Sequence, residues 1–352
     1  MRLREIYILA LVANIIVGMA PGTDVPTLDK LIDKVQTEAR TADGSDNEGD
    51  PGKRNSGFKI DSSAFASVNF LFQANMAAPP VLPVNFTATT NWPQCRDTFE
   101  RIVDQGNCGS CWAVSAANVL SDRYCVKNLQ IKFFSYQDVL ECCSFCGIGC
   151  GGGSTLNAFQ YFNQTGIVAG GLYQDTKSCK PYFFPPCNDP NFRNTIPCRA
   201  VLKLPACTYS CQDSFNQNSC RSSSPNPDSF NTCINNPFQI YFGDKSKSMM
   251  YYRISKDEST IMLEIFQNGP ITAGYLIYTD FFAYKSGVYK YTSGYFQGAH
   301  AIKIIGWGVE NGVKYWLCVN SWGPLWGENG RFKIIRGINH LYIEQFLVSA
   351  QF

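Results

Sequence analysis

A cysteine in the first turn of a predicted helix is the feature that most constrains the fold. Residues 105–112 read Gln-Gly-Asn-Cys-Gly-Ser-Cys-Trp and lead into an apolar stripe near helical spacing, and Gly109 and Ser110 supply a flexible, capping entry. Cys111 then faces unpaired backbone N–H groups and the positive end of the helix dipole, which favour a thiolate over a thiol. The pattern therefore predicts a nucleophilic cysteine.

Cys108 and Cys111 also form a C-x-x-C pair, which taken alone fits a redox dithiol or half of a zinc site. The rest of the chain favours the nucleophile. His300, one of only two histidines, lies beside the apolar run 301–305, and Asn320 follows another apolar run in Val-Asn-Ser-Trp-Gly. A lone histidine beside a strand is usually structural, but chance seldom produces a Cys, a His and an Asn that are each flanked by Gly or Trp.

These motifs resemble those of the papain family of cysteine proteases, whose local signature is the Cys-Gly-Ser-Cys-Trp sequence at 108–112. The resemblance extends from residue 82 to the C-terminus. It implies an α+β, papain-like two-domain fold, with a helical left domain, a β-barrel-like right domain and the active-site cleft between them. It also implies that Cys111 is the nucleophile, His300 the general base, Asn320 the residue that orients His300, and Gln105 the oxyanion-hole donor.

The N-terminal region predicts a secreted precursor. Residues 1–20 have two arginines and then an apolar run ending in small residues, which is typical of a cleaved signal peptide. No later run is long enough to span a bilayer, so we expect a soluble chain in the secretory pathway, either lysosomal or extracellular. Residues 21–80 contain an amphipathic stretch at 27–40 and an acidic linker. By resemblance they form a propeptide that lies along the cleft and inhibits the enzyme, and a disordered spacer is the alternative.

The mature cathepsin B-like peptidase domain is expected at 81–352, with a cleavage site that the resemblance does not fix. Its helical part would cover 81–195, including a segment like the occluding loop of cathepsin B, and its barrel part would cover 196–352. The barrel part contains a Cys-, Ser- and Asn-rich insertion at 211–244. Its strand-like runs lie at 301–305, 314–319 and 330–335, after a helix near 259–268.

With Cys111 set aside as the nucleophile, 15 of the 16 cysteines remain, so at least one more thiol should be free. We expect this to be Cys318, which lies inside an apolar strand-like run. Resemblance to cathepsin B implies the disulfides Cys95–Cys125, Cys108–Cys150, Cys142–Cys207, Cys143–Cys146, Cys179–Cys211 and Cys187–Cys198, with Cys220–Cys233 left by elimination. A zinc site in the cluster at 142–150 is the disfavoured alternative in a secreted chain.

By resemblance, Gly152 and Gly153 leave the backbone open to pair with an extended substrate, and a flexible turn is the alternative. Trp322 would shield the hydrogen bond between the histidine and the asparagine. Phe346 aligns with the position where cathepsin B has an acid at the base of its S2 pocket. An apolar floor predicts an apolar P2 preference and poor acceptance of Arg there, and Glu344 is the competing acid.

The loop between Cys187 and Cys198 lacks the two adjacent histidines with which cathepsin B binds the C-terminal carboxylate of its substrate. Only Arg193 offers a positive charge there. Leu325 stands where the family tends to have an acid that latches this loop. We therefore expect an endopeptidase whose carboxydipeptidase activity is weak or absent.

Asn85-Phe-Thr and Asn163-Gln-Thr are acceptor sequons for N-glycosylation. No metal or organic cofactor is implied, and the expected partners are protein and peptide substrates and the chain's own propeptide. A net charge of +2 argues for neither nucleic acid nor a membrane surface. Two other functions stay open: a catalytically silent secreted binding or matrix protein, and a thiol oxidoreductase that uses Cys108 and Cys111.

Overall fold

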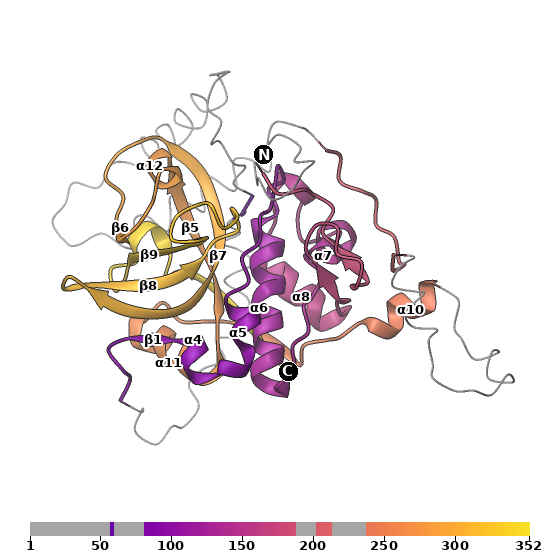
Figure 1. Cartoon of the computed structure of the whole chain (residues 1–352), viewed down its shortest axis with the longest axis horizontal. Helices are drawn as coiled ribbons and strands as arrows, with labels where there is room; N and C mark the ends of the chain where they lie inside the picture. Colours follow the sequence, from indigo (N-terminus) through magenta and orange to yellow (C-terminus); the bar gives the residue numbers. More distant parts are fainter. Residues whose placement is uncertain (1–56, 60–80, 188–201, 213–236) are drawn as a thin grey trace, which may run out of the picture.

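A computed structural model describes residues 57–59, 81–187, 202–212 and 237–352. Within them, a group of helices lies on one side and a curled β-sheet on the other, with helix α6 (Cys111–Asn128) between the two (Figure 1). This is the α+β arrangement of two parts that the sequence predicts. The signal peptide at 1–20, the amphipathic stretch at 27–40, the loop at 188–197 and most of the insertion lie outside the described residues.

Helix α6 is buried along most of its length, since 14 of its 18 residues are buried. The sequence predicted one apolar stripe. The structure differs because α6 packs against strands β7 (Phe296–Glu310) and β10 (Phe346–Gln351) as well as helices α7 (Tyr136–Cys142) and α8 (Thr155–Gln164). A helix covered by neighbours on both sides needs small or apolar residues all round.

Serine caps fix the starts of α7 and α8. Ser135 Oγ accepts the backbone N–H of Asp138 at 3.0 Å, and Ser154 Oγ accepts that of Asn157 at 3.3 Å. Each serine thereby satisfies a donor that the first turn of a helix leaves unpaired. Because Ser154 directly follows the glycines at 151–153, its cap also fixes where this glycine run ends.

The other half is an eight-stranded sheet in the order β4-β10-β5-β7-β8-β9-β6, with β1 paired to β7. The remaining strands are β1 (Phe86–Thr87), β4 (Met250–Arg253), β5 (Ile271–Tyr278), β6 (Val288–Tyr289), β8 (Val313–Val319) and β9 (Arg331–Ile335). Neighbours are antiparallel, except that β6 pairs with β9 in parallel. The predicted strand-like runs fall in β7, β8 and β9, and the predicted helix is α11 (Glu258–Asn268).

Strand β7 pairs with β5 along its first part and with β8 along its second part. It begins at Phe296, well before the predicted run, because its first part pairs with β5 and places His300 opposite Tyr275. Its second part pairs with β8, where Lys303 is opposite Val319. Asn320, the residue after β8, therefore lies close to the part of β7 that carries His300.

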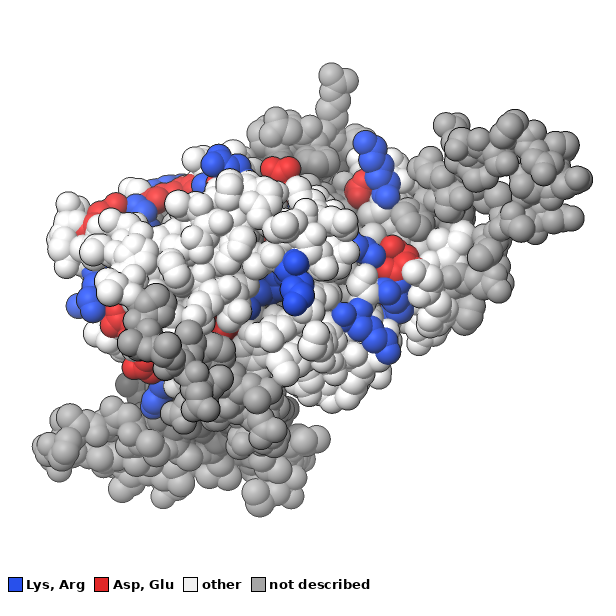
Figure 2. Space-filling model, turned by 90° about the horizontal axis from the view of Figure 1, so that it is seen from below, with Lys and Arg blue, Asp and Glu red and all other residues white. Residues whose placement is uncertain are grey.

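Short elements complete the described chain. They are α4 (Ala88–Asn91), η1 (Pro93–Cys95), α5 (Arg96–Phe99), η2 (Gly149–Gly151), β2 (Gly170–Gly171), β3 (Lys180–Pro181), α10 (Pro237–Asp244), α12 (Thr279–Phe282) and η4 (His340–Tyr342). None of the helices in the described ranges is long and apolar enough to cross a membrane. On the face seen in Figure 2, Lys and Arg side chains are interspersed with Asp and Glu, and uncharged residues cover most of the surface.

Two buried ion pairs join α6 to the sheet half. Lys303 Nζ lies 2.9 Å from Asp122 Oδ2, and the Arg123 guanidinium donates to Glu264 Oε1 at 2.8 Å. All four side chains are buried, so each charge depends on its partner. The pairs hold α6, and with it Cys111, in a fixed position relative to the sheet.

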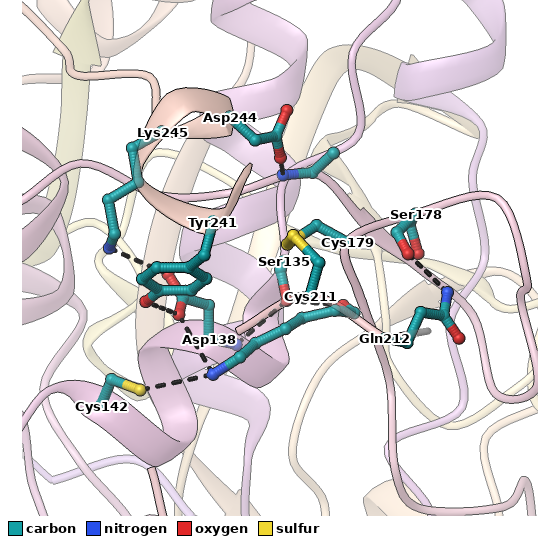
Figure 3. Close-up of a disulfide and its surroundings, with 12 residues drawn as sticks. Ser135, Asp138, Cys142, Ser178, Cys179, Cys211, Gln212, Tyr241, Asp244 and Lys245 are labelled. Atoms are coloured by element: carbon teal, nitrogen blue, oxygen red, sulfur yellow. Dashed lines mark hydrogen bonds and ion pairs between the residues drawn. A yellow bond between two sulfur atoms is a disulfide. The ribbon is translucent and has the colours of Figure 1, made fainter. Parts of the chain in front are cut away.

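The described ends of the insertion pack on the helical half (Figure 3). The disulfide between Cys179 and Cys211 ties its start, and Tyr241 of α10 donates to the buried Asp138 Oδ1 at 2.5 Å. The sequence assigned this segment to the barrel part, whereas its described ends contact Asp138 of α7 and, through the disulfide, Cys179. A buried carboxylate needs donors, and the tyrosine hydroxyl supplies one.

Five disulfides lie within the described residues: Cys95–Cys125, Cys108–Cys150, Cys142–Cys207, Cys143–Cys146 and Cys179–Cys211. These are pairs that the resemblance to cathepsin B implies. Cys187 is also disulfide-bonded, and its partner lies outside the described residues, where Cys198, Cys220 and Cys233 are found. Cys111 and Cys318 are free. Because every cysteine at 142–150 is bridged, this cluster has no thiolate for zinc.

Candidate active site

Cys111 is the first residue of α6, and its thiol is buried and free. Its neighbour in the C-x-x-C pair, Cys108, is instead bonded to Cys150. A redox dithiol needs both thiols, and a zinc site needs both thiolates. The structure therefore contradicts the oxidoreductase and zinc interpretations of this motif and leaves Cys111 as a single thiol.

The Cys111 sulfur lies among backbone donors from three segments. The backbone N–H groups of Ala301 in β7, of Gly57, and of Trp112 and Cys111 in the first turn of α6 lower the pKa of the thiol, against the rise that burial causes. Donors at a helix N-terminus stabilise negative charge on the sulfur. Ala301 directly follows His300 in β7, so the strand that carries the histidine also contributes a backbone N–H at the sulfur.

His300 and Asn320 form a buried hydrogen bond, with 2.8 Å between Nε2 and Oδ1. The N–H of Ser321 also donates to this Oδ1, which fixes the orientation of the amide. Because an amide oxygen only accepts, Nε2 carries the imidazole proton and Nδ1 keeps its lone pair in the neutral ring. Nδ1 has no hydrogen-bond partner among the described residues, so its lone pair is not engaged by any of them.

Trp322 covers this pair. Its ring centroid lies 4.9 Å from that of His300, and Phe282 stacks on it at 5.2 Å. The indole is fully buried. The aromatic cover keeps water away from the bond between histidine and asparagine, which strengthens that bond in the low local dielectric.

The Gln105 side chain is held at both ends of its amide. Its Oε1 accepts the Ser321 hydroxyl at 2.6 Å, and its Nε2 donates to the Cys108 carbonyl at 2.9 Å. An amide nitrogen carries two N–H groups, and the bond to Cys108 uses one of them. The amide is thus fixed beside the segment that leads into Cys111.

Residues 57–59 lie in extended form across the site. Gly153 exchanges two backbone hydrogen bonds with this segment: its N–H donates to Gly57 O at 2.9 Å, and its carbonyl accepts from Lys59 N at 2.8 Å. The N–H of Phe58 donates to Ala299 O at 3.2 Å. Phe58 is thereby bridged in parallel with Gly153 and antiparallel with Ala299, as a peptide strand would be.

Glycines permit this close approach. A Cβ built on Gly57 would lie 1.7 Å from Gly109 O, and one on Gly152 would lie 2.6 Å from Gly57 O. Gly152 also has a positive φ of 103°. Larger residues at either side of this contact would separate the two backbones.

The Phe58 ring is buried over Gly274 of β5, and the space that the ring fills is called the Phe58 pocket below. A Cβ built on Gly274 would lie 2.1 Å from the ring, so the ring sits directly over that glycine. Phe346 lies opposite Gly274 in the pairing of β5 with β10, and it shares a buried cluster with Phe58 and Ala301.

Glu344 does not face this pocket. Its Oε1 accepts from Trp316 Nε1 at 2.9 Å and from the backbone N–H of Gly337 at 2.6 Å, and its Oε2 accepts from the backbone N–H of Asn339 at 2.6 Å. Three donors already serve the carboxylate. The Glu344 carboxylate is therefore engaged by Trp316 and by the turn at 337–344, and the role of Phe346 as the pocket floor stays a prediction.

A comparison with protein families matches residues 86–351 to the model for the papain family cysteine protease. The chain belongs to the papain family of cysteine proteases. It is 41% identical over 272 residues to "Cathepsin B-like cysteine proteinase 4" of Caenorhabditis elegans, covering 76% of this chain and 75% of the relative. It is 40% identical over 273 residues to "Gut-specific cysteine proteinase" of the same organism, covering 77% of this chain and 74% of that relative.

Solved structures agree with this assignment. The structure of "proCathepsin B S9 from Trypanosoma congolense" matches with a TM-score of 0.67 and 32% identity, over 84% of this chain and 85% of that one. The proform of the ragweed allergen Amb a 11 matches with a TM-score of 0.54 and 21% identity, over 78% and 67%, and shares the fold. The predicted papain-like fold and cysteine peptidase activity are confirmed.

In this papain-family structure Cys111 and His300 are both fully buried. Burial raises the pKa of Cys111 to about 11 and lowers the pKa of His300 to about 4. The sequence predicted a thiolate and imidazolium pair. In this covered state the removal of water outweighs the N–H donors around the sulfur and the bond from His300 to Asn320. The ion pair of the open site stays a prediction.

Sequence reasoning missed two contacts in the papain-family site. Ser321 orients Gln105, and the motif that contains Asn320 offered a signal for this, since the serine is the next residue. The second is Tyr182, whose hydroxyl donates to Gln105 O at 2.8 Å. No motif surrounds Tyr182, and only the folded chain brings it to the site.

Several predicted residues of the papain-family site are not brought together. Arg193 lies outside the described residues, and Leu325 is 64% exposed.

The two predicted glycosylation sites differ in their surroundings. Asn85 is exposed, whereas Asn163 Nδ2 donates to the carbonyls of residues 248 and 249 at 2.9 and 3.0 Å. Glycosylation of both asparagines stays a prediction.

Proposed function

We propose that the chain is the precursor of a secreted or lysosomal cysteine endopeptidase with an apolar P2 preference and weak or absent carboxydipeptidase activity. The observation that supports this most directly is the Phe58 ring over Gly274, directly after Gly57, whose backbone N–H lies at the Cys111 sulfur. A side chain held there by strand pairing with Gly153 has the position of a substrate residue.

In the mature enzyme, His300 Nδ1 takes the proton of the Cys111 thiol. The free site is wet once residues 57–59 leave, so the ion pair no longer bears the burial penalty of the covered state. In cysteine proteases that pair the nucleophile with histidine, the thiol pKa falls to roughly 3 to 4. Asn320 keeps the imidazole in the tautomer that this transfer needs.

The thiolate then attacks the peptide carbonyl. The Gln105 amide and the backbone N–H of Cys111 stabilise the oxyanion, and the loss of one such donor typically lowers the rate by about a hundred- to a thousandfold. His300 next returns its proton to the leaving amine as the C–N bond breaks. Water hydrolyses the resulting thioester, with His300 again as the base.

Residues 57–59 would silence the precursor without being cut. The Gly57 carbonyl accepts the N–H of Gly153, and its own N–H faces the Cys111 sulfur. A scissile peptide must present a carbonyl carbon to the thiolate, whereas the Gly57 carbonyl is engaged by Gly153 and its N–H is the group at the sulfur. The contact therefore has the form of an inhibitory propeptide within the region 21–80.

The pocket floor supports the P2 preference. Phe346 gives no partner to a basic side chain, and Glu344 is engaged elsewhere. Burial of an unpaired guanidinium is costly, so Arg at P2 should be disfavoured relative to Leu or Phe. The proposed endopeptidase activity rests on two features. The sequence at 188–197 has no histidine, and Leu325, which is exposed, stands where the family tends to have an acid that holds this loop in place.

The test compares two peptides with Leu at P2 that differ only in a free or an amidated C-terminus, cut by the processed enzyme. Cys111→Ser serves as the blank. Similar cleavage of both peptides is expected. A strong preference for the free acid, released as dipeptides, would overturn the endopeptidase proposal. If neither peptide, nor a broader peptide set, were cut above the blank, the chain would act instead as a silent binding protein.

A further inference from the structure

Tyr182 joins two segments that frame the nucleophile. It lies just after β3, and its side chain is buried. Its hydroxyl oxygen lies 2.6 Å from Ser110 Oγ and 2.8 Å from the carbonyl oxygen of Gln105. Because a carbonyl only accepts, the single phenolic proton goes to Gln105, and Ser110 must donate to the tyrosine.

The Ser110 hydroxyl therefore does not make the capping hydrogen bond that is usual for a serine at the start of a helix. Ser110 is the N-cap residue of α6, yet its side chain makes no capping bond to the helix. Its carbonyl accepts the N–H groups of Ala113 and Val114, so it is firmly part of the helix entry. The bond to Tyr182 therefore ties the helix start to a different segment.

Gln105 is held from two sides. From the sheet half, Ser321 accepts its backbone N–H at 2.8 Å and donates to its side-chain Oε1 at 2.6 Å. From the helical half, Tyr182 donates to its backbone carbonyl. We propose that Tyr182 is a positioning residue that fixes the Gln105 donor relative to the first turn of α6, where the second oxyanion donor lies.

The segment that carries Tyr182 supports the same loop at two further points. The N–H of Cys187 donates to Asp104 Oδ2 at 3.1 Å, and Asp104 Oδ1 accepts the N–H of Gly106 at 2.9 Å. A Cβ built on Gly106 would lie 2.4 Å from Pro185 O. Residues 182–187, which lead into the loop at 188–197, thus pack along the oxyanion loop at 104–110.

Burial raises the pKa of Tyr182 well above its usual value, so the phenol stays protonated across the pH range of a peptidase. Its replacement should therefore lower the rate without shifting the pH profile. Tyr136 provides a matched control. It is equally buried, its ring lies 4.8 Å from that of Tyr182, and its hydroxyl has no hydrogen-bond partner among the described residues.

The experiment compares Tyr182→Phe and Tyr136→Phe with the wild type, each alone and combined with Gln105→Ala, after processing of the precursor by the same added protease. We expect Tyr182→Phe to lower kcat by about tenfold with little change in KM, because a misplaced donor stabilises the transition state less. Tyr136→Phe should match the wild type. In the Gln105→Ala background, Tyr182→Phe should lower kcat little further, because the donor that Tyr182 positions is absent.

Three results would overturn the inference. The first is an unchanged kcat for Tyr182→Phe, and the second is an equal loss of kcat for Tyr136→Phe. The third is a double variant whose loss of kcat equals the product of the separate losses for Tyr182→Phe and Gln105→Ala. The inference rests on the proposed function, and the two failures are distinguishable. A wild type that cuts nothing above the Cys111→Ser blank removes the proposed function and this inference with it. A wild type that cuts no faster than Tyr182→Phe removes the inference alone.

Discussion

Phe346 and Glu344 stand two residues apart in the chain but serve different parts of the molecule. Phe346 lies opposite Gly274 in the pairing of β5 with β10, and the Phe58 ring packs over that glycine. The Glu344 carboxylate receives three hydrogen bonds within the neighbouring turn and from Trp316. The identity of one side chain thus sets the chemistry of the pocket.

Replacement of this side chain should change the P2 preference. In Phe346→Glu, a carboxylate at the floor can pair with a guanidinium that the wild-type pocket leaves unpaired. We expect the ratio of kcat/KM for Arg over Leu at P2 to rise by about a hundredfold, which corresponds to about 2.7 kcal/mol. The measurement uses a matched pair of amidated peptides.

Phe346→Gln is the control for this substitution. It removes the apolar floor without adding a charge, so it should raise the ratio far less than Phe346→Glu. Equal ratios in the two variants, or no change in either, would show that Phe346 does not form the floor of the P2 pocket.

At the scale of elements, the short strand at 57–59 occupies the site through its backbone and through one side chain. Gly153 and Ala299 bind its backbone, which any sequence could offer. Only the Phe58 side chain enters the pocket. Strand pairing therefore supplies position, and the aromatic ring supplies apolar burial.

Phe58→Ala should loosen this cover in the intact precursor. Burial of a Phe side chain is worth about 1.5–3 kcal/mol, so we expect alkylation of Cys111 by iodoacetamide at pH 7 to become at least about tenfold faster. Lys59→Ala is the matched control, because its backbone bond to Gly153 survives the substitution and its side chain is exposed. Equal alkylation rates in the precursor and in both variants would contradict a role for the ring.

The sequence predicted those elements whose positions follow from neighbouring residues in the chain. The helix entry at Cys111 follows from the glycine and serine before it, and the runs in β8 and β9 follow from their apolar residues. The full burial of α6 did not follow, because it depends on neighbours on both sides. The contacts of Tyr182 with Ser110 and Gln105 join distant segments, and no local pattern reports them.

At the scale of the whole molecule, the site exists only when the two halves are held together. Cys111 and Gln105 come from the helical side, whereas His300 and Asn320 come from β7 and the end of β8. The position of α6 depends on buried charge pairs across the boundary, including the pair of Arg123 with Glu264.

Glu264→Gln should destabilise the mature protein by about 3 kcal/mol, because it leaves the buried Arg123 guanidinium without its counter-charge. Lys314→Met is the control. It breaks the pair with Glu258, in which the lysine side chain is 57% exposed, and should cost less than about 1 kcal/mol. Urea unfolding in a Cys111→Ser background measures both. Equal losses would contradict the role of the buried pair.

The central claim is that one thiol and one imidazole are neutral under residues 57–59 and become a reactive ion pair when that segment leaves. The most direct test is the rate of Cys111 alkylation by iodoacetamide against pH, in the precursor and in the processed enzyme, with Cys111→Ser as the blank. In the precursor the rate should rise with pH toward the thiol pKa of about 11, because the thiolate fraction is small below it. The processed enzyme should already react rapidly near pH 5 and change little up to pH 8, as roughly expected for a thiol pKa near 4. Matching profiles in the two forms, with reaction only at alkaline pH, would contradict the account.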